Sequence, residues 1–241
     1  PMIVFTSDID WAPEEVIADT INLFEFYGVR CTFFSTHHSI ELTKCNKNLF
    51  ETGIHPNFNP ILNGRSDKRA VDIVDEIMDI HPEAQGVRSH SMLQSSELLQ
   101  MFTDKKLLYD ANHFLPYHTG LKPYKLWTGL VRIPYNWEDD VHWTYGYSFD
   151  NSGMNLEDED LVVFDFHPIH VYLNTENKYR YNEAKKHYQD AKALLEFRNT
   201  EVVGTRDLLI SLLSYCKHNN LTTRKLADIA NEFLLKSKDG I

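Results

Sequence analysis

The segment Ile3-Val4-Phe5-Thr6-Ser7-Asp8-Ile9-Asp10-Trp11 places two carboxylates directly after a short apolar run near the start of the chain. The apolar run predicts a buried strand. Because alternate side chains of a strand share one face, Asp8 and Asp10 are expected to point the same way, about 7 Å apart. Two carboxylates at a strand end suggest a metal site. Pro13-Glu14-Glu15 follows and predicts a helix start, so a turn or capping role for both aspartates stays open.

Short apolar runs alternate with amphipathic stretches along much of the chain. The predicted strands are 3–6, 30–35, 52–54, 85–87, 107–109, 130–133 and 161–166. Between the first two, Val16, Ile17, Ile21 and Phe24 recur at helical spacing, and Gly28 is a typical helix end. Strands alternating with helices predict parallel pairing with right-handed crossovers. Seven such strands indicate a barrel, complete or distorted, more than an open sheet.

Two later segments depart from this alternation. Prolines, glycines and tryptophans in residues 117–147 predict long loops around one strand. From Glu176 onward the pattern predicts helices over 179–197, 207–218 and 223–236, with Thr222 as the N-cap of the last. No linker or internal repeat is visible, so we expect a single domain over residues 1–241.

Composition excludes several classes of partner. The 241-residue chain is 42% apolar and carries a formal charge of −11 without a basic stripe. Nucleic acid and anionic membranes are therefore disfavoured, because phosphate binding requires clustered Lys and Arg. No long apolar stretch or basic leader occurs, which predicts no membrane span and a cytoplasmic location. The three cysteines are widely spaced and fit reduced thiols. Oligomeric state stays open.

Polar side chains follow each predicted strand, and in parallel α/β folds the carboxyl ends of strands gather at one site. In strand order they are Asp8 and Asp10; Thr36, His37 and His38; His55, Asn57 and Asn59; Arg88, Ser89 and His90; Asp110 and Asn112; Arg132 and Tyr135; His167 and His170. Imidazole with carboxylate is the ligand set of zinc and similar metals. A further free carboxylate and imidazole would supply a general base and a general acid.

These motifs resemble the NodB-homology polysaccharide deacetylases, carbohydrate esterase family 4, over most of residues 3–175. The first family motif, Thr-Phe-Asp-Asp-Gly, is matched loosely by residues 6–10. The second, His-Ser/Thr-x-x-His, reads His55-Pro56-Asn57-Phe58-Asn59, so asparagine replaces the second histidine. The third keeps Arg88 but continues as Ser89-His90-Ser91 instead of Pro-Tyr-Gly. The last motif, a histidine-proline pair after an apolar strand, is matched fully by residues 167–168.

The resemblance implies a distorted (β/α)7 barrel with C-terminal helices and a role for each retained residue. Asp8 would be the base and His167 the acid, and Arg88 would orient Asp8 through a charge-assisted hydrogen bond. Asp10 and His55 would bind a divalent metal, with zinc expected first and cobalt or nickel as alternatives. The third ligand is either His90 or Asn59. We favour His90, because an imidazole suits zinc better than an amide oxygen.

The implied activity is removal of an acetyl or similar acyl group from an amino sugar or oligosaccharide. Within the family, the asparagine-bearing motif resembles a branch associated with bacterial O-antigen and other surface-polysaccharide loci. Trp137, Trp143, Tyr135 and Tyr145 would either stack on sugar rings or pack in the core. Two other functions are left open. The site could be degenerate and bind sugar without catalysis, or the Asp-x-Asp could belong to a haloacid dehalogenase-type phosphatase, which would leave His55 and His167 unused.

Overall fold

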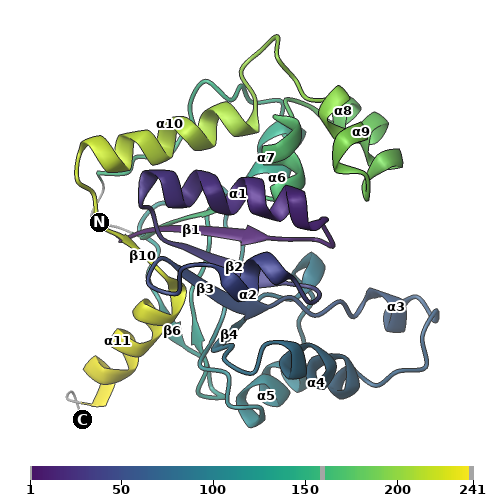
Figure 1. Cartoon of the computed structure of the whole chain (residues 1–241). Helices are drawn as coiled ribbons and strands as arrows, with labels where there is room; N and C mark the ends of the chain where they lie inside the picture. The colour runs from purple at the N-terminus through teal and green to yellow at the C-terminus, as the bar shows by residue number, and fades with distance from the viewer. Residues whose placement is uncertain (1, 158–160, 239–241) are drawn as a thin grey trace.

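A curled sheet runs through the centre of the computed structural model, which describes residues 2–157 and 161–238 (Figure 1). The strand order is β6-β7-β5-β4-β3-β2-β1-β9-β8, with β10 beside the start of β1. The pairing is parallel except between β6 and β7. The strands are β1 (Met2–Asp8), β2 (Cys31–Ser35), β3 (Phe50–Ile54), β4 (Gly86–Val87), β5 (Tyr109–Asp110), β6 (Tyr124–Lys125), β7 (Val131–Arg132), β8 (Trp137–Glu138), β9 (Leu161–Asp165) and β10 (Thr223–Arg224).

Helices cover the sheet, and this curled half-barrel confirms the predicted distorted (β/α)7 architecture. Figure 1 shows α1 and α10 above β1, α4 and α5 on the opposite side, and α11 beside β10. The helices are α1 (Glu14–Tyr27), α2 (Ile40–Lys44), α3 (Asn59–Leu62), α4 (Ala70–Ile80), η1 (His90–Met92), α5 (Ser96–Asp104), α6 (Asp139–Thr144), α7 (Pro168–Leu173), α8 (Lys178–Ala184), η2 (Lys185–His187), α9 (Ala191–Glu196), α10 (Thr205–His218) and α11 (Leu226–Lys238).

Strand β1 separates two buried clusters and thereby fixes the direction of its polar side chains. Ile3 and Phe5 belong to the cluster under α1, α7 and α10, where Phe5 stacks on Phe164 with ring centroids 5.2 Å apart. Val4 belongs to the cluster on the other face, which includes the buried residues of α11. Since alternate residues share a face, Asp8 points to the same side as Val4. The strand therefore delivers the Asp8 carboxylate to the inner side of the curled sheet.

Two predictions for the C-terminal region were wrong. The helix expected over 179–197 is divided into α8, η2 and α9, with a break before Asp190, whose side chain caps α9. The helix expected from residue 223 begins only at Leu226, because Thr223 and Arg224 form β10 and pair with Ile3 and Val4 of β1. In both places tertiary contacts override a continuous helical pattern.

The segment 117–147 is more ordered than predicted. The one expected strand is present as β7. The segment also contains β6, which pairs with β7, β8, which pairs with β9, and the helix α6 after β8. These strands have two residues each, which is too short for an alternating pattern to be visible in the sequence. Among the described residues, no helix is both long enough and apolar enough to cross a membrane. The cytoplasmic location stays a prediction.

Candidate metal centre and active site

The polar residues that follow β1, β3, β4 and β9 lie around one cavity of about 130 Å³. This is the edge at which the sequence predicted a site. The lining residues are Asp8, Asp10, His55, Arg88, Ser89, His90, Ser91, Met92, Tyr135, Glu138, Asp140 and His167. Of the residues to which the family resemblance gave a catalytic or metal-binding role, Asn59 alone is outside this lining.

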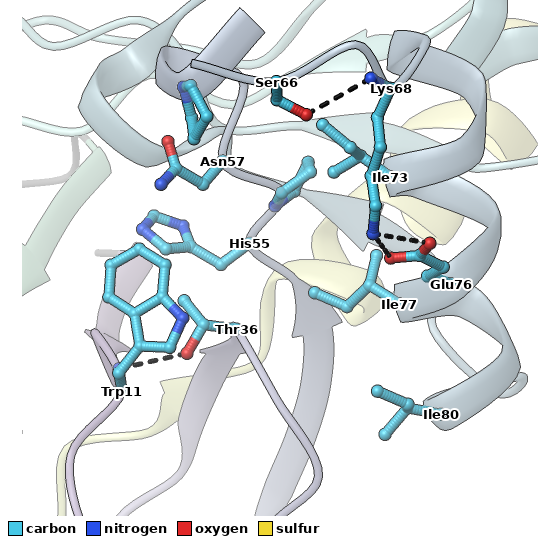
Figure 2. A pocket seen from close by; sticks show the side chains of 12 residues that line it. Trp11, Thr36, His55, Asn57, Ser66, Lys68, Ile73, Glu76, Ile77 and Ile80 are labelled. Atoms are coloured by element: carbon cyan, nitrogen blue, oxygen red, sulfur yellow. Dashed lines mark hydrogen bonds and ion pairs between the residues drawn. The ribbon is translucent and has the colours of Figure 1, made fainter.

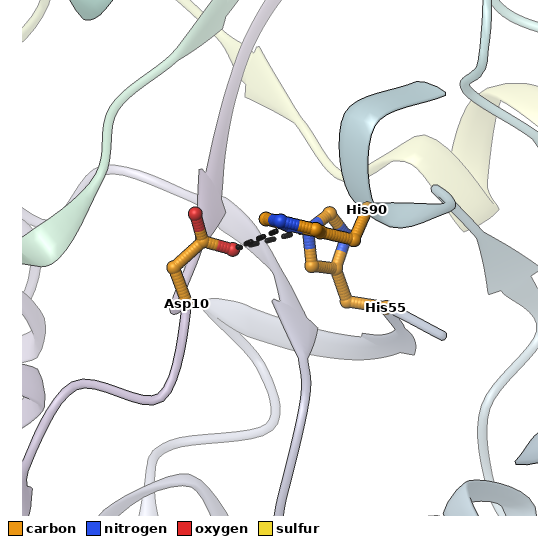
Figure 3. A group of neighbouring side chains, drawn as sticks. All are labelled: Asp10, His55 and His90. Atoms are coloured by element: carbon orange, nitrogen blue, oxygen red, sulfur yellow. Dashed lines mark hydrogen bonds and ion pairs between the residues drawn. The ribbon is translucent and has the colours of Figure 1, made fainter. Parts of the chain in front are cut away.

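Three of these residues form a compact cluster of donor atoms. Asp10 Oδ1 lies 3.2 Å from His55 Nε2 and 3.3 Å from His90 Nδ1, and the two nitrogens are 3.3 Å apart. Figure 3 shows the carboxylate facing both imidazoles. Ligands of a tetrahedral ion with bonds of about 2.0–2.2 Å are about 3.3–3.6 Å from one another. The three atoms therefore have the spacing of one face of a zinc coordination tetrahedron.

The surroundings of the cluster support this reading. The other nitrogen of His55, Nδ1, is 2.6 Å from the main-chain oxygen of Arg88, so Nδ1 carries the proton and Nε2 presents its lone pair to the cluster. Asp10 Oδ1 is buried without a well-formed hydrogen bond among the described residues. Burial by itself raises the pKa of Asp10, but His55, His90 and His167 together lower it below its ordinary value. An ionised, incompletely satisfied carboxylate fits a cation.

Asn59, the alternative third ligand, lies beside the cluster and not in it. It begins the short helix α3, and its side-chain nitrogen donates a 3.0 Å hydrogen bond to Ser91 Oγ. Asn59 is also outside the lining of the cavity that contains Asp10, His55 and His90. Of the two alternatives, the geometry therefore favours His90, which enters through the segment that replaces the family's Pro-Tyr-Gly.

Arg88 is buried beneath the site and binds two carboxylates at once. Its Nη1 donates to Asp8 Oδ1 at 3.0 Å and to Asp165 Oδ1 at 2.7 Å. The guanidinium lies between the rings of Phe34 and Tyr135, at 4.7 and 4.1 Å from their centroids. A buried cation held in this way restricts Asp8 to one orientation. The other oxygen of Asp8 is 3.7 Å from His55 Nε2, at the edge of the donor cluster.

Asp165 is a member of this group that the sequence analysis missed. Burial and the nearby Asp8 carboxylate raise its pKa to about 7, although Arg88 acts in the opposite direction. Its Oδ2 is buried without a hydrogen-bond partner among the described residues. The signal in the sequence is an aspartate inside the apolar run 161–166.

His167 is positioned by Asp139, the second residue that was missed. Asp139 Oδ1 accepts from His167 Nδ1 at 2.7 Å, and Oδ2 accepts from the main-chain N–H of His167 at 2.8 Å. His167 Nε2 therefore faces the cavity, 3.7 Å from Asp10 Oδ2. Burial lowers the pKa of His167, but the carboxylates of Asp139, Asp165 and Asp10 together raise it well above its ordinary value. A protonated imidazole fits the role of acid.

The aromatic residues of segment 117–147 divide between core and surface. Trp137 and Tyr135 are buried, which excludes them as exposed stacking platforms, whereas Tyr145 is exposed. Tyr135 instead lies over Arg88 and donates a 3.0 Å hydrogen bond to Glu138. Burial and the neighbouring Asp140 raise the pKa of Glu138 well above its ordinary value.

Comparison with known proteins adds independent information. The sequence profile of the WbmS-like polysaccharide deacetylases matches residues 5–185. A crystal structure of WbmS from Bordetella bronchiseptica, assigned as a polysaccharide deacetylase involved in O-antigen biosynthesis, is 40% identical with a TM-score of 0.81, covering 88% of this chain and 90% of that one. A search of curated protein sequences gave no significant match.

A more distant structure shares the fold alone. The 4-alpha-glucanotransferase of Thermococcus litoralis has a TM-score of 0.52 at 10% identity, covering 96% of this chain and 38% of that one. A family 4 pseudoenzyme from Bacillus anthracis has a TM-score of 0.47 at 11% identity, covering 95% of this chain and 65% of that one. The profile match over most of the chain and the 40% identity to WbmS agree with each other. The chain belongs to the WbmS-like family of polysaccharide deacetylases.

Proposed function

We propose that this protein is a metal-dependent deacetylase that removes an acetyl or similar acyl group from an amino sugar during assembly of a bacterial surface polysaccharide. Family membership and the similarity to WbmS support the reaction class and the biological setting. The observation that carries the proposal is the cluster of Asp10, His55 and His90, with Asp8 on one side and His167 on the other. A phosphatase would leave both histidine arrangements without a purpose.

The metal would be held by Asp10 Oδ1, His55 Nε2 and His90 Nδ1. Zinc is the first candidate for this ligand set, with cobalt or nickel as alternatives. When bound, such an ion lowers the pKa of water and polarises an acyl carbonyl. The main-chain carbonyl of Arg88 accepts a hydrogen bond from His55 Nδ1 and so fixes the tautomer of His55, which leaves Nε2 available to bind the ion.

The remaining residues would move protons. Asp8, oriented by Arg88, would accept a proton from the attacking water. His167, protonated and held by Asp139, would donate a proton to the amine as the carbon–nitrogen bond breaks. A new carbon–oxygen bond replaces the broken one, so the products are acetate and a free amino sugar. Arg88 acts through Asp8 and is therefore a positioning residue.

The test is acetate release from acetamido sugars by zinc-reconstituted protein, beside Asp8→Asn, Asp10→Ala and His55→Ala. We expect Asp8→Asn to abolish turnover and keep the metal, because Asp8 is outside the donor cluster. Asp10→Ala and His55→Ala should lose both turnover and the metal. Loss of metal in Asp8→Asn would contradict the division of roles. A protein that binds acetamido sugars but releases no acetate would instead be a catalytically degenerate relative.

A further inference from the structure

Two carboxyl groups in the lining of the metal-centre cavity have no part in the reaction above. Glu138 ends β8 and Asp140 is in the first turn of α6, and both line this cavity together with His167. Asp139, the residue between them, instead turns both of its oxygens to His167. The segment 138–140 thus supplies one carboxylate that positions the acid and two that border the same cavity as the Nε2 atom of His167.

Glu138 and Asp140 are hydrogen-bonded to each other, and Glu138 Oε2 also accepts a 3.0 Å hydrogen bond from the hydroxyl of Tyr135. Burial and Asp140 raise the pKa of Glu138 well above its ordinary value. Burial also raises the pKa of Asp140, but His167, the hydrogen bond with Glu138 and His170 together lower it below its ordinary value. The proton is therefore on Glu138, and the negative charge of the pair is on Asp140.

The charge of Asp140 has no ion-pair partner in the described part of the chain. Arg88 is the one lysine or arginine that lines this cavity, and it is bound to two other carboxylates. The proton on His167 Nδ1 is bound to a third. A second cavity, of about 340 Å³, adjoins this one, but its single lysine, Lys68, pairs with Glu76 of α4 (Figure 2).

An ionised carboxylate on the wall of a cavity is destabilising unless a cation lies near it. Asp140 Oδ1 is buried, and no donor except Glu138 reaches it within residues 2–157 and 161–238. Asp140 also belongs to none of the groups whose donor atoms converge on a metal position in the described residues. The cation that Asp140 can contact therefore comes with the substrate.

Deacetylation creates such a cation at one substrate atom, the nitrogen. As water bonds to the acyl carbon, Asp8 takes one of its protons, and His167 then transfers a proton to the nitrogen of the adduct. The nitrogen has four bonds and a positive charge until the carbon–nitrogen bond breaks and leaves its electron pair on the nitrogen. The released amine takes a further proton from solvent, so amide and water give ammonium and acetate overall. This nitrogen has to approach His167 Nε2, and its charge thus appears in the cavity that Asp140 borders.

We propose that Asp140 contacts the substrate nitrogen as it becomes positively charged, and that this contact makes the enzyme selective for N-acetyl over O-acetyl groups. The proposal rests on the deacetylase function above. A fixed negative charge stabilises the protonated adduct more than the neutral amide, which lowers the barrier for the amide. An ester oxygen is far less basic and leaves as a neutral alcohol, so it gains nothing from Asp140.

Two sugars that differ only in N–H against O test this selectivity by acetate release from zinc-loaded protein. They are the methyl glycoside of N-acetylglucosamine and methyl 2-O-acetylglucoside. Asp140→Asn keeps the shape of the side chain and removes its charge, and Asp150→Asn, at an exposed position, is the matched control. We expect Asp140→Asn to lower kcat for the amide about 100-fold and kcat for the ester less than about threefold. Asp150→Asn should leave both unchanged.

An equal loss for amide and ester would overturn the proposal, because a residue that acts through His167 or through the fold affects both leaving groups. Wild-type turnover of the amide by Asp140→Asn would overturn it as well. Zinc content should be the same in all three proteins, since Asp140 is outside the donor cluster.

Binding of the product separates this proposal from the deacetylase function. Methyl glucosaminide, an ammonium ion at about pH 6, and uncharged methyl glucoside are titrated calorimetrically into zinc-loaded protein. We expect wild type and Asp150→Asn to bind the ammonium sugar at least about tenfold more tightly, and Asp140→Asn to lose this preference. The preference without acetate release would support the role of Asp140 as the cation site while the deacetylase proposal fails. No preference in wild type, or its retention in Asp140→Asn, would overturn the role of Asp140.

Discussion

The hydroxyl of Tyr188 donates a 2.5 Å hydrogen bond to the main-chain oxygen of Asp10, across 178 residues of sequence. Asp10 and Trp11 both have left-handed backbone angles, with φ of 39° and 58°. Such angles are unfavourable for residues other than glycine and persist where surrounding contacts enforce them. Gln189 Nε2 donates a second hydrogen bond, of 2.9 Å, to the oxygen of Trp11. The turn that aims the Asp10 carboxylate is thus held from the distant segment 188–189.

Tyr188→Phe removes this hydroxyl and keeps the ring. We expect zinc affinity to fall about tenfold, because groups that orient metal ligands typically contribute this much. Competition with a chromophoric chelator measures the dissociation constant. Tyr172→Phe is the matched control, since its hydroxyl also donates to a main-chain oxygen, that of Ala191, away from the metal cluster. Equal affinity in Tyr188→Phe and wild type, or an equal loss in both variants, would contradict a positioning role for Tyr188.

The identity of the third metal ligand can be settled by metal content. We expect wild type to retain about one equivalent of zinc after reconstitution and desalting, as one tetrahedral site requires. His90→Ala should lose it, because His90 Nδ1 is 3.3 Å from Asp10 Oδ1. Asn59→Ala should keep it, because Asn59 does not line the cavity of the cluster and its side-chain nitrogen donates to Ser91. Loss of zinc in Asn59→Ala with retention in His90→Ala would reverse the assignment.

Asp139→Asn tests how His167 is positioned. Both oxygens of Asp139 accept hydrogen bonds from His167, and an amide can accept on one side only. We expect kcat for acetate release to fall about 100-fold or more, since the imidazole loses its orientation and its ionic partner. Zinc content should not change, because Asp139 is not in the cluster with Asp10. Asp150→Asn, at an exposed position, is the control. Wild-type turnover in Asp139→Asn would exclude this role.

Asp165→Asn should change how stability depends on pH. The folded-state pKa of Asp165, about 7, exceeds its ordinary value of 3.8, so between these values the folded protein binds more protons than the unfolded chain. This contribution is fully present below about pH 4 and is lost as the pH rises through about 7. From pH 5 to 7, the free energy of unfolding of wild type should therefore fall relative to Asp165→Asn, by about 1–3 kcal/mol.

Urea unfolding of metal-free protein at pH 5 and pH 7 measures this difference, and comparing the two proteins cancels the titration of the other groups. Parallel pH dependence in wild type and Asp165→Asn would show that Asp165 is ionised throughout, as a simple ion pair with Arg88 would require. The same experiment on the control Asp150→Asn should reproduce the wild-type dependence.

Local patterns in the sequence determine the strands and the ends at which the chemistry gathers. Alternation along residues 3–8 separates the two faces of β1, because side chains of a strand point to opposite sides. The positions of Asp8, Asp10, His55, Arg88 and His167 around one cavity were likewise expected, since parallel strands bring their carboxyl ends together. Such inferences depend only on neighbours in the chain and on the periodicity of strands and helices.

Tertiary structure decided everything that depends on partners distant in sequence. His90 lies next to Asp10 because the segment after β4 faces the end of β1 in the folded chain. Packing also pairs Asp139 with His167 and Asp165 with Arg88. It divides the helix expected over 179–197, and from that segment Tyr188 and Gln189 donate hydrogen bonds to Asp10 and Trp11. Periodicity contains no information about such contacts, because hydrogen bonds between distant residues depend on how the elements pack in space and not on their local sequence.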